Sequence, residues 1–400
     1  MMIPSLALAA LLPALAAAIP CVQFDADDNL YAFGGQEDVA LGDSNAWASP
    51  APKPLSTDGR PPWNGNFSQC LLSRNANALY VLGADASDAG AIYIYDFAGN
   101  AWTKQVTTGA GDSMQNSRSS AVLDHNTNVI FTVGNTNMYS LDFGAVTTTA
   151  AGSLTWGIAS SPQIASEGYK VTAAAASNHI NYYGVPGSEA GSTSMFVVHY
   201  NYWQPQPAKY TPVGGKNFPA QSGQAVSLAT ANSTLPPYQN LFVPNDLSSA
   251  YIVTHYTADW SWNDTKSAPM AVSLVNSTQE LPAPTAKDTE ASYACSETHC
   301  VQMDTKGNIY YINAVGKDYT VTPGAKWDKL GYTLTPYVAP TPSDASGSAT
   351  GSATGSAGAG GASNPAAAPN GKSGGAESTF HGGILGAVLG VAALAIAAIA

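Results

Sequence analysis

The histidines are the first residues of this chain to consider as metal ligands or acid–base groups. Five precede residue 340, namely His125, His179, His199, His255 and His299. No two of them follow the HxH or HxxxH spacing that places two imidazoles on one face of a strand or helix. Three of them, His179, His199 and His255, occupy or adjoin apolar runs, where a structural, hydrogen-bonded histidine is the usual occupant. The sequence therefore predicts neither a metal site nor a bound cofactor.

Other catalytic groups are sparse. Arg60, Arg74 and Arg118 are the only arginines, too few for the arginine cluster with which sialidases hold a carboxylate. The GxSxG turn of serine hydrolases does not occur. A glycosidase pair of carboxylates stays open, because Asp and Glu residues from distant segments can converge without regular spacing along the chain. A carbohydrate-active enzyme, hydrolase or oxidase, is therefore the alternative function.

The elements that must position such residues form a repeat. A short run of β-forming residues that ends in Gly or Asn recurs six times, at intervals of 49, 51, 50, 61 and 68 residues. Intervals near 50 are typical of a propeller blade with four strands. The runs are Leu30–Gly34, Leu79–Gly83, Ile130–Gly134, Ile180–Gly184, Leu241–Asn245 and Ile309–Asn313. Each is trailed by a tryptophan that we expect to pack between sheets: Trp47, Trp102, Trp156, Trp203, Trp260 and Trp327.

The first and last copies also agree in the residues before the run. CVQFDADDNLY at Cys21–Tyr31 and CVQMDTKGNIY at Cys300–Tyr310 share six of eleven positions, and Cys70 stands at the matching place in the second copy. We interpret this segment as the innermost strand of its blade. Cys21, Cys70 and Cys300 would then hold equivalent positions in neighbouring blades. The pattern predicts six blades, each formed by one continuous segment. No strand is left over for a closing blade that combines strands from both ends of the chain.

Four cysteines favour two disulfides over a metal cluster or a reactive thiol, because their number is even and the chain carries secretion signals. Three connectivities exist for Cys21, Cys70, Cys295 and Cys300. We favour Cys295 with Cys300 and Cys21 with Cys70 over a clasp from Cys300 to Cys21.

These features resemble the kelch-repeat propellers, including the galactose-oxidase-like group, which share a hydrophobic strand, a Gly-Gly pair (Gly34-Gly35 here) and spaced Tyr and Trp. The resemblance covers about residues 20–335 and implies an all-β, six-bladed kelch-like β-propeller. Only the first copy keeps both glycines, and copies five and six end in Asn, which tolerates the left-handed conformation that the turn would need. The radical oxidases of the group require seven blades and a free Cys for a thioether bond to Tyr, which this chain does not offer.

Ligands of such a ring would meet its loops. The long connections, 50–66, 83–90, 184–194 and 204–223, are expected on one face, and Trp63, Tyr202 and Tyr210 lie in or beside them. Flat aromatic rings suit sugars, and Arg60 with Asp58 would add hydrogen bonds, so these five residues are the predicted ligand site. The alternative is that Trp63 and Tyr210 cover blade edges.

Both ends of the sequence carry processing signals. Residues 1–18 are apolar and end in Ala16-Ala17-Ala18, as in a cleaved signal peptide. Residues 376–400 combine a short spacer with a hydrophobic tail, as in a propeptide for attachment of glycosylphosphatidylinositol (GPI), with Ser373 as the attachment residue and Asn370 or Gly374 as alternatives. With the kelch-like repeat, the whole resembles a fungal-type GPI-anchored surface protein.

Between these ends we expect a propeller at 19–340 and a disordered Ser/Gly/Ala-rich stalk at 341–375, which has no large apolar residue to bury. Secretion also makes four sequons candidate N-glycosylation sites: Asn66, Asn232, Asn263 and Asn276. A net charge of −12 offers no basic surface for nucleic acid.

The predicted function is therefore a GPI-anchored extracellular propeller on the outer face of the plasma membrane or in the cell wall. It would act as a monomeric recognition or structural module, with a cell-wall glycan or a protein as ligand. An enzyme would instead need two carboxylates or a metal converging at the mouth of the propeller channel, whereas a glycan-binding module needs an exposed aromatic patch.

Overall fold

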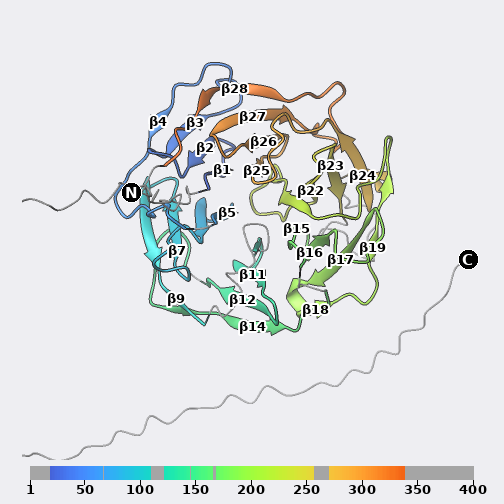
Figure 1. Ribbon diagram of the computed structural model, residues 1–400, viewed down its shortest axis with the longest axis horizontal. Helices are drawn as coiled ribbons and strands as arrows, with labels where there is room; N and C mark the ends of the chain where they lie inside the picture. Colours follow the sequence, from blue (N-terminus) through green and yellow to red (C-terminus); the bar gives the residue numbers. More distant parts are fainter. Residues whose placement is uncertain are drawn as a thin grey trace, which may run out of the picture. The chain divides into compact units, whose positions relative to one another are not determined.

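Six mainly antiparallel sheets of four or five strands surround a central axis in the computed structural model (Figure 1). The chain is thus a six-bladed β-propeller, as predicted. Helix is confined, in the parts of the chain described, to the short turns η2 (Val198–Tyr200) and η3 (Val272–Leu274). The structure describes residues 19–65, 67–109, 121–144, 146–164, 168–255 and 270–337.

The predicted terminal segments, 1–18 and 341–400, lie outside the described residues, as do Asn66 and Asn263 and the proposed attachment residue Ser373. No described helix is long and apolar enough to span a membrane. The chain divides after Thr341 into two units, and all strands and both disulfides lie in the first. A chain that ends at Thr341 therefore keeps the complete propeller.

Each blade has its first strand (A) at the centre of the ring and its fourth (D) at the rim. Blade 1 contains β1 (Cys21–Phe24), β2 (Leu30–Phe33), β3 (Val39–Gly42) and β4 (Lys53–Pro54). Blade 2 contains β5 (Gln69–Ser73), β6 (Ala78–Leu82), β7 (Ile92–Asp96) and β8 (Ala101–Gln105). Blade 3 contains β10 (Val122–Asp124), β11 (Val129–Val133), β12 (Met138–Asp142) and β14 (Gly157–Ser160).

Blade 4 contains β15 (Ala173–Ala176), β16 (His179–Tyr183), β17 (Ser192–Val197), β18 (Tyr202–Trp203) and the extra β19 (Ala208–Lys209). Blade 5 contains β21 (Gly223–Ser227), β22 (Gln239–Pro244), β23 (Ala250–Thr254), β24 (Ser277–Leu281) and the rim strand β20 (Thr211–Pro212). Blade 6 contains β25 (Ser292–Cys295), β26 (His299–Met303), β27 (Asn308–Asn313) and β28 (Asp328–Thr333). Strands β9 (Thr107–Thr108) and β13 (Leu154–Thr155) pair between blades 2 and 3.

Burial on both faces explains why the repeated runs are continuously apolar. Successive side chains of a strand point to opposite faces of its sheet. In β6, Tyr80 and Leu82 pack toward blade 3, whereas Leu79 and Val81 pack toward blade 1. Six buried clusters fill the six gaps between neighbouring blades, and this is how the ring buries its core.

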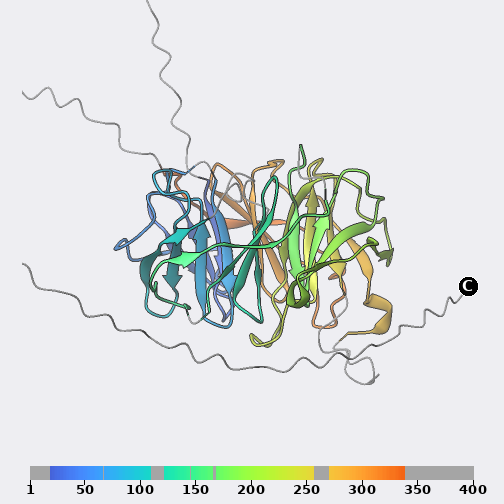
Figure 2. The ribbon, with the colours of Figure 1, turned by 90° about the horizontal axis from the view of Figure 1, so that it is seen from below.

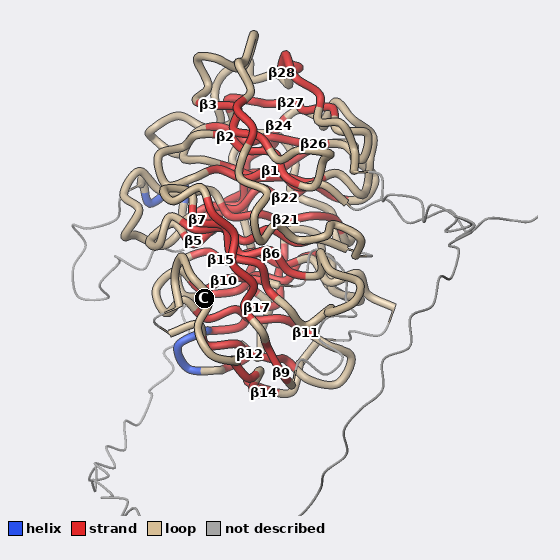
Figure 3. The backbone as a smooth tube through the Cα atoms, turned by 90° about the vertical axis from the view of Figure 1, so that its left-hand side faces the viewer, coloured by secondary structure: helices blue, strands red, loops and turns tan. Residues whose placement is uncertain are grey.

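The ring is a thick disc with two faces (Figures 2 and 3). Strands cross its thickness, and the turns gather at the two faces. Turns between strands A and B and between C and D share one face, which we call the A–B face. Turns between B and C, and the connections to the next blade, share the other, which we call the B–C face.

The predicted runs coincide with strand B in five blades but not in the sixth. Ile309–Asn313 belongs to β27, the third strand of blade 6, and Cys300 lies on β26, the second strand. The prediction that Cys300 occupies an inner strand is therefore wrong, and Cys295 on β25 holds that place. The segment that follows this run, Asp318 to Val321, lies in a loop with one isolated bridge.

Both glycines of the first repeat are required, Gly34 by its backbone conformation and Gly35 by the close of the ring. Gly34 has a φ of 84°, which favours glycine. A Cβ on Gly35 would lie 2.7 Å from Leu334 side-chain atoms and from the Thr335 carbonyl oxygen. The chain that leaves blade 6 returns here to blade 1, where Gln36 N–H donates to Thr335 O at 2.9 Å. Asn245 and Asn313 do not adopt positive φ, so the left-handed turn expected of copies five and six is wrong.

Both favoured disulfides are present. Cys21–Cys70 joins the inner strands of blades 1 and 2, and Cys295–Cys300 joins β25 to β26 within blade 6. The trailing tryptophans Trp47, Trp102, Trp156 and Trp203 are buried as predicted, and Trp327 is half-buried. Trp260 lies outside the described residues.

Candidate functional site

A channel runs along the axis of the ring, and its cavity has a volume of about 170 Å³. Residues of all six inner strands line it. An inner strand pairs with strand B on one side only, so its other backbone edge faces the channel with unpaired amide and carbonyl groups.

Side chains from neighbouring blades satisfy part of this free edge. The Gln69 amide donates to Ala121 O at 2.6 Å and accepts from Ala121 N at 3.1 Å, which links blades 2 and 3. Ser227 Oγ donates to Ala175 O at 2.7 Å, which links blades 5 and 4. Each bond removes an unpaired backbone group from the channel wall and holds two blades together.

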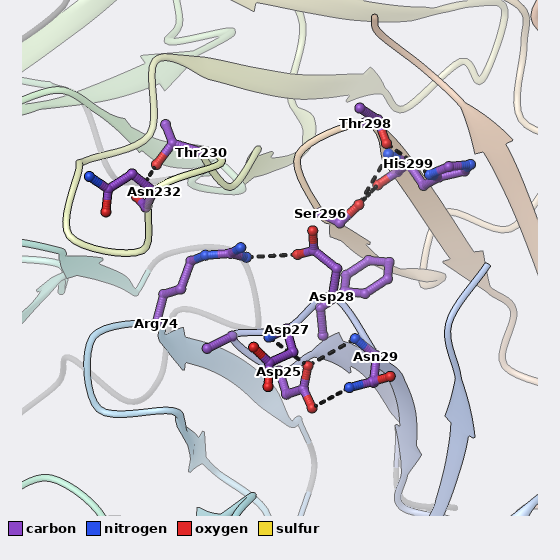
Figure 4. A network of polar contacts seen from close by, with 12 residues as sticks. Asp25, Asp27, Asp28, Asn29, Arg74, Thr230, Asn232, Ser296, Thr298 and His299 are labelled. Atoms are coloured by element: carbon purple, nitrogen blue, oxygen red, sulfur yellow. Dashed lines mark hydrogen bonds and ion pairs between the residues drawn. The ribbon is translucent and has the colours of Figure 1, made fainter. Parts of the chain in front are cut away.

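An ion pair between neighbouring blades lies at the A–B mouth of the channel. Arg74 Nη1 of blade 2 lies 2.8 Å from Asp28 Oδ1 of blade 1, and the Arg74 side chain is only 8% exposed (Figure 4). The carboxylate of Asp25 is hydrogen-bonded within its own hairpin, because it accepts from Asn29 N, Asn29 Nδ2 and Tyr31 Oη. The turn that carries Asn232 in blade 5 lies on the opposite side of this mouth from blade 1 (Figure 4).

A chain of buried polar groups connects blades 4 and 5. Tyr210 Oη donates to Asn181 Oδ1 at 2.8 Å and lies 3.1 Å from His255 Nδ1. His255 Nε2 lies 3.3 Å from His179 Nδ1. Since Tyr210 donates its proton to Asn181, His255 donates from Nδ1 and accepts at Nε2 from His179, so that each imidazole carries one proton. Burial lowers the pKa of His179 to about 4 and that of His255 to about 3.

We expect acid to destabilise the fold through these two histidines. Their folded pKa values lie below about 6.5, the unfolded value, so the unfolded chain binds the extra protons first and stability falls as pH drops from 6.5 toward 4. Between pH 6.5 and 5.5 each should cost about 1 kcal/mol. Burial also lowers the pKa of His125 and His299, whose contributions have the same sign.

Urea unfolding followed by tryptophan fluorescence at pH 7.5, 6.5 and 5.5 measures this loss. An NMR titration supplies the control, since the imidazole signals of His179 and His255 should stay in the neutral form down to pH 5.5. Equal stability at the three pH values, or titration of both imidazoles near pH 6.5, would contradict the assignment.

Two of the predicted ligand residues are buried. Trp63 is 0% exposed and packs against Trp102 between blades 1 and 2. Tyr210 is 4% exposed and belongs to the cluster between blades 4 and 5. The interpretation of these rings as an exposed platform is wrong, because the connections that carry them fold back between adjacent sheets. The alternative, that they cover blade edges, describes their packing.

Arg60 and Asp58 also differ from the expected site. Arg60 makes two short bonds to Asp38, from Nε at 2.6 Å and from Nη2 at 2.7 Å, so its guanidinium is already used inside the protein. Asp58 is exposed two residues away on the B–C face. Arg60 therefore fixes the Gly34–Asp38 turn rather than offering free donors to a ligand.

Tyr202 is exposed, but it does not belong to the face expected. It begins β18 directly after the turn between strands C and D of blade 4, and therefore lies toward the A–B face. Its neighbour Tyr200, which was not among the predicted ligand residues, is 82% exposed, and Tyr202 is 52% exposed. Of the three predicted aromatic ligand residues, only Tyr202 is exposed in the structure, and Tyr200 is exposed two residues before it.

The described residues contain no group of three or more His, Cys, Asp or Glu side chains arranged to hold a metal ion. No family model matches the chain, and no curated protein matches it. One solved structure with similarity is described as "Streptogramin B lyase structure", at 11% sequence identity and a TM-score of 0.39, over 80% of this chain and 86% of that chain. A similarity this low carries no argument about activity, and the fold assignment rests on the sheet topology.

Proposed function

We propose that this chain is an extracellular, kelch-type propeller that is held at the cell surface by a GPI anchor and binds cell-wall glycans. Two disulfides are compatible with an oxidising, extracellular environment. The signal-like residues 1–18, the stalk at 341–375 and the attachment motif at Ser373 support the anchored location. The sequon residues Asn232 and Asn276 are both exposed, as sites of N-glycosylation would be.

The exposed tyrosines of blade 4 carry the glycan part of the proposal. Tyr200 and Tyr202 are the only aromatic residues among the strongly exposed large apolar side chains of the described chain. Their turn is fixed on both sides, because Val198 and Trp203 are buried. The backbone of the turn is held in this way, so it presents both rings to solvent with little backbone freedom to lose on binding a sugar.

Polar groups next to these rings would supply hydrogen bonds to sugar hydroxyls. His199 of the same turn lies with Nε2 3.5 Å from Asp124 Oδ2 of blade 3. Asn126 of that neighbouring turn is exposed and donates to Asn178 of blade 4 at 3.0 Å. An aromatic platform rimmed by amide and imidazole groups is typical of carbohydrate recognition.

Binding is favoured over catalysis by the state of Asp25 and Asp28, two carboxylates at the A–B mouth of the channel. Asp25 is saturated by its own turn, and Asp28 is paired with Arg74. A glycosidase would need two carboxyl groups facing one glycosidic bond, roughly 5 to 9.5 Å apart. These two carboxylates are instead committed to the turn and to the ion pair.

The test begins with the protein displayed on cells. Phosphatidylinositol-specific phospholipase C should release it, and the released protein should bind glycans on an array without cleaving or oxidising them. The double substitution Tyr200→Ala and Tyr202→Ala is expected to weaken binding by at least about tenfold, because it removes both stacking faces.

Ile158→Ser is the matched control, because Ile158 is 66% exposed on blade 3 and its loss also removes exposed apolar surface. It should leave glycan binding unchanged. Unaltered binding by the tyrosine double variant would reject the platform, and turnover of a bound glycan would replace the binding function by an enzymatic one. Retention of the protein on cells after lipase treatment would reject the anchor.

A further inference from the structure

The channel wall contains buried polar atoms that have no hydrogen-bond partner. Arg74 Nε, His125 Nε2 and Ser68 Oγ are such atoms, and all three residues line the channel cavity. Arg74 is 7% exposed as a whole residue. A buried donor without a partner costs roughly 1 to 3 kcal/mol, so a group that accepts from it inside the cavity would be bound favourably.

The guanidinium of Arg74 has one side occupied and another side free. Nη1 donates to Asp28 at 2.8 Å, whereas Nε has no partner. A guanidinium is a planar fork of five N–H donors, and its separate edges can hold separate carboxylates in the same plane. The ion pair with Asp28 therefore orients the Arg74 guanidinium and leaves its Nε–H free to donate to a second carboxylate.

His125 stands on blade 3 and places a second unpartnered nitrogen, Nε2, near the same end of the channel. Its imidazole lies against the backbone of Ser233 and Thr234 in the blade 5 turn, which brings it to the A–B mouth. Arg74 and His125 come from the ends of the inner strands of adjacent blades, β5 and β10. A neutral imidazole has one N–H, so His125 donates to a carboxylate oxygen only as the Nε2–H tautomer, beside the Nε–H of Arg74.

The remaining wall combines free backbone edges and polar side chains with small apolar side chains. Alanines of β15 and leucines of β5 and β10 contribute to it, among them Ala173, Ala175, Leu71 and Leu123. A cavity of about 150 Å³ with apolar walls accepts a benzene ring, and the volume here is about 170 Å³. The space therefore has room for a body of about one ring, which can pack against these alanines and leucines.

We infer that the central channel binds a small carboxylate with an apolar body, such as an aromatic acid, whose carboxylate is held by Arg74 and His125 at the A–B mouth. This site is distinct from the tyrosine turn of blade 4 and does not rest on glycan binding. The propeller would then carry a second ligand of low molecular weight inside the ring.

The three arginines of the chain make the test direct. The chain ending at Thr341 is labelled with ¹⁵N-arginine, and the Nε–H signal of Arg74 is identified by its loss in Arg74→Lys. Titration with sodium benzoate should shift this signal saturably. The signal of Arg60 is the internal control, because Arg60 Nε is fully engaged with Asp38 at 2.6 Å and should not move.

Calorimetry then measures the contribution of the Nε donor. Arg74→Lys keeps a cation for Asp28 but removes Nε, so benzoate affinity should fall at least about tenfold. Benzamide, which has the same ring without the charge, should bind at least tenfold more weakly than benzoate. Circular dichroism and the melting temperature confirm that the variant is folded.

Three outcomes would overturn the inference. The Arg74 signal could stay unmoved by benzoate, or sodium chloride could shift it as much as benzoate does, which would show ionic screening only. Benzamide could also bind as well as benzoate, which would assign the cavity to neutral ligands. Loss of glycan binding in the Tyr200 and Tyr202 variant with benzoate binding retained would separate this site from the proposed glycan platform.

Discussion

Replacement of Cys21 and Cys70 by serine is expected to lower the free energy of unfolding by about 4 kcal/mol. The bond joins residues that are 49 positions apart in the sequence, so its loss releases a long loop in the unfolded chain. It also connects the inner strands β1 and β5, where blade 1 receives the chain returning from blade 6. The double variant should therefore unfold at lower urea concentration and melt several degrees lower.

The second disulfide provides the matched control. Cys295 and Cys300 are only five positions apart and belong to adjacent strands of one hairpin. Because the entropy of the closed loop grows with the logarithm of its length, their replacement by serine should cost about 2 kcal/mol, half as much. Calorimetry and urea unfolding measure the loss in free energy of unfolding of each double variant. A larger loss at Cys295–Cys300 would show that local geometry, rather than loop length, governs the stability of this ring.

The sequence predicted six blades because it shows strand B in five of them and strand C, β27, in the sixth. In those five blades strand B is buried on both faces. Such a strand must be continuously apolar, and that pattern is visible without any knowledge of contacts. The run Ile309–Asn313 was predicted as strand B of blade 6 but is strand C. The error arose because the β26–β27 turn resembles the β1–β2 turn. Asp25 and Asp304 each accept backbone N–H bonds within their turns and a bond from Asn29 or Asn308. The similarity is therefore one of hairpin chemistry, which can recur between any two antiparallel strands.

The candidate site was less predictable because it depends on contacts between blades. Position in a long connection says nothing about whether Trp63 points outward or returns beneath Gly34, against which it packs. The pair of His179 and His255 is 76 positions apart, and Arg74 meets Asp28 across 46. No spacing rule links such residues. A usable signal did exist for Tyr200, since it stands two residues from Tyr202 in a run of polar and aromatic residues before Trp203.

Removal of the Arg60 side chain by Arg60→Met is expected to destabilise the fold by about 3 to 5 kcal/mol. Asp38 has a side chain that is 1% exposed, and Arg60 is its only cationic partner in the described structure. Without the guanidinium, the carboxylate would keep the Gly34 N–H bond of 2.7 Å but would lose both charged bonds. A buried charge without its partner lowers the free energy of unfolding strongly. Urea unfolding at pH 7 measures the loss.

A double-mutant cycle and the pH dependence identify the cause. Arg60→Met combined with Asp38→Asn removes both charges and should recover at least about 2 kcal/mol relative to Arg60→Met alone. Burial raises the pKa of Asp38, and Arg60 opposes that rise more than the Gly34 N–H bond does, so the single variant raises this pKa further. Its folded state then binds a proton more readily than its unfolded state, and its deficit against the wild type should narrow as pH falls from 7 toward 5. A deficit that stays constant with pH, together with no recovery in the double variant, would mean that Arg60 stabilises this turn by packing and by its bond to Gly35 O rather than by charge.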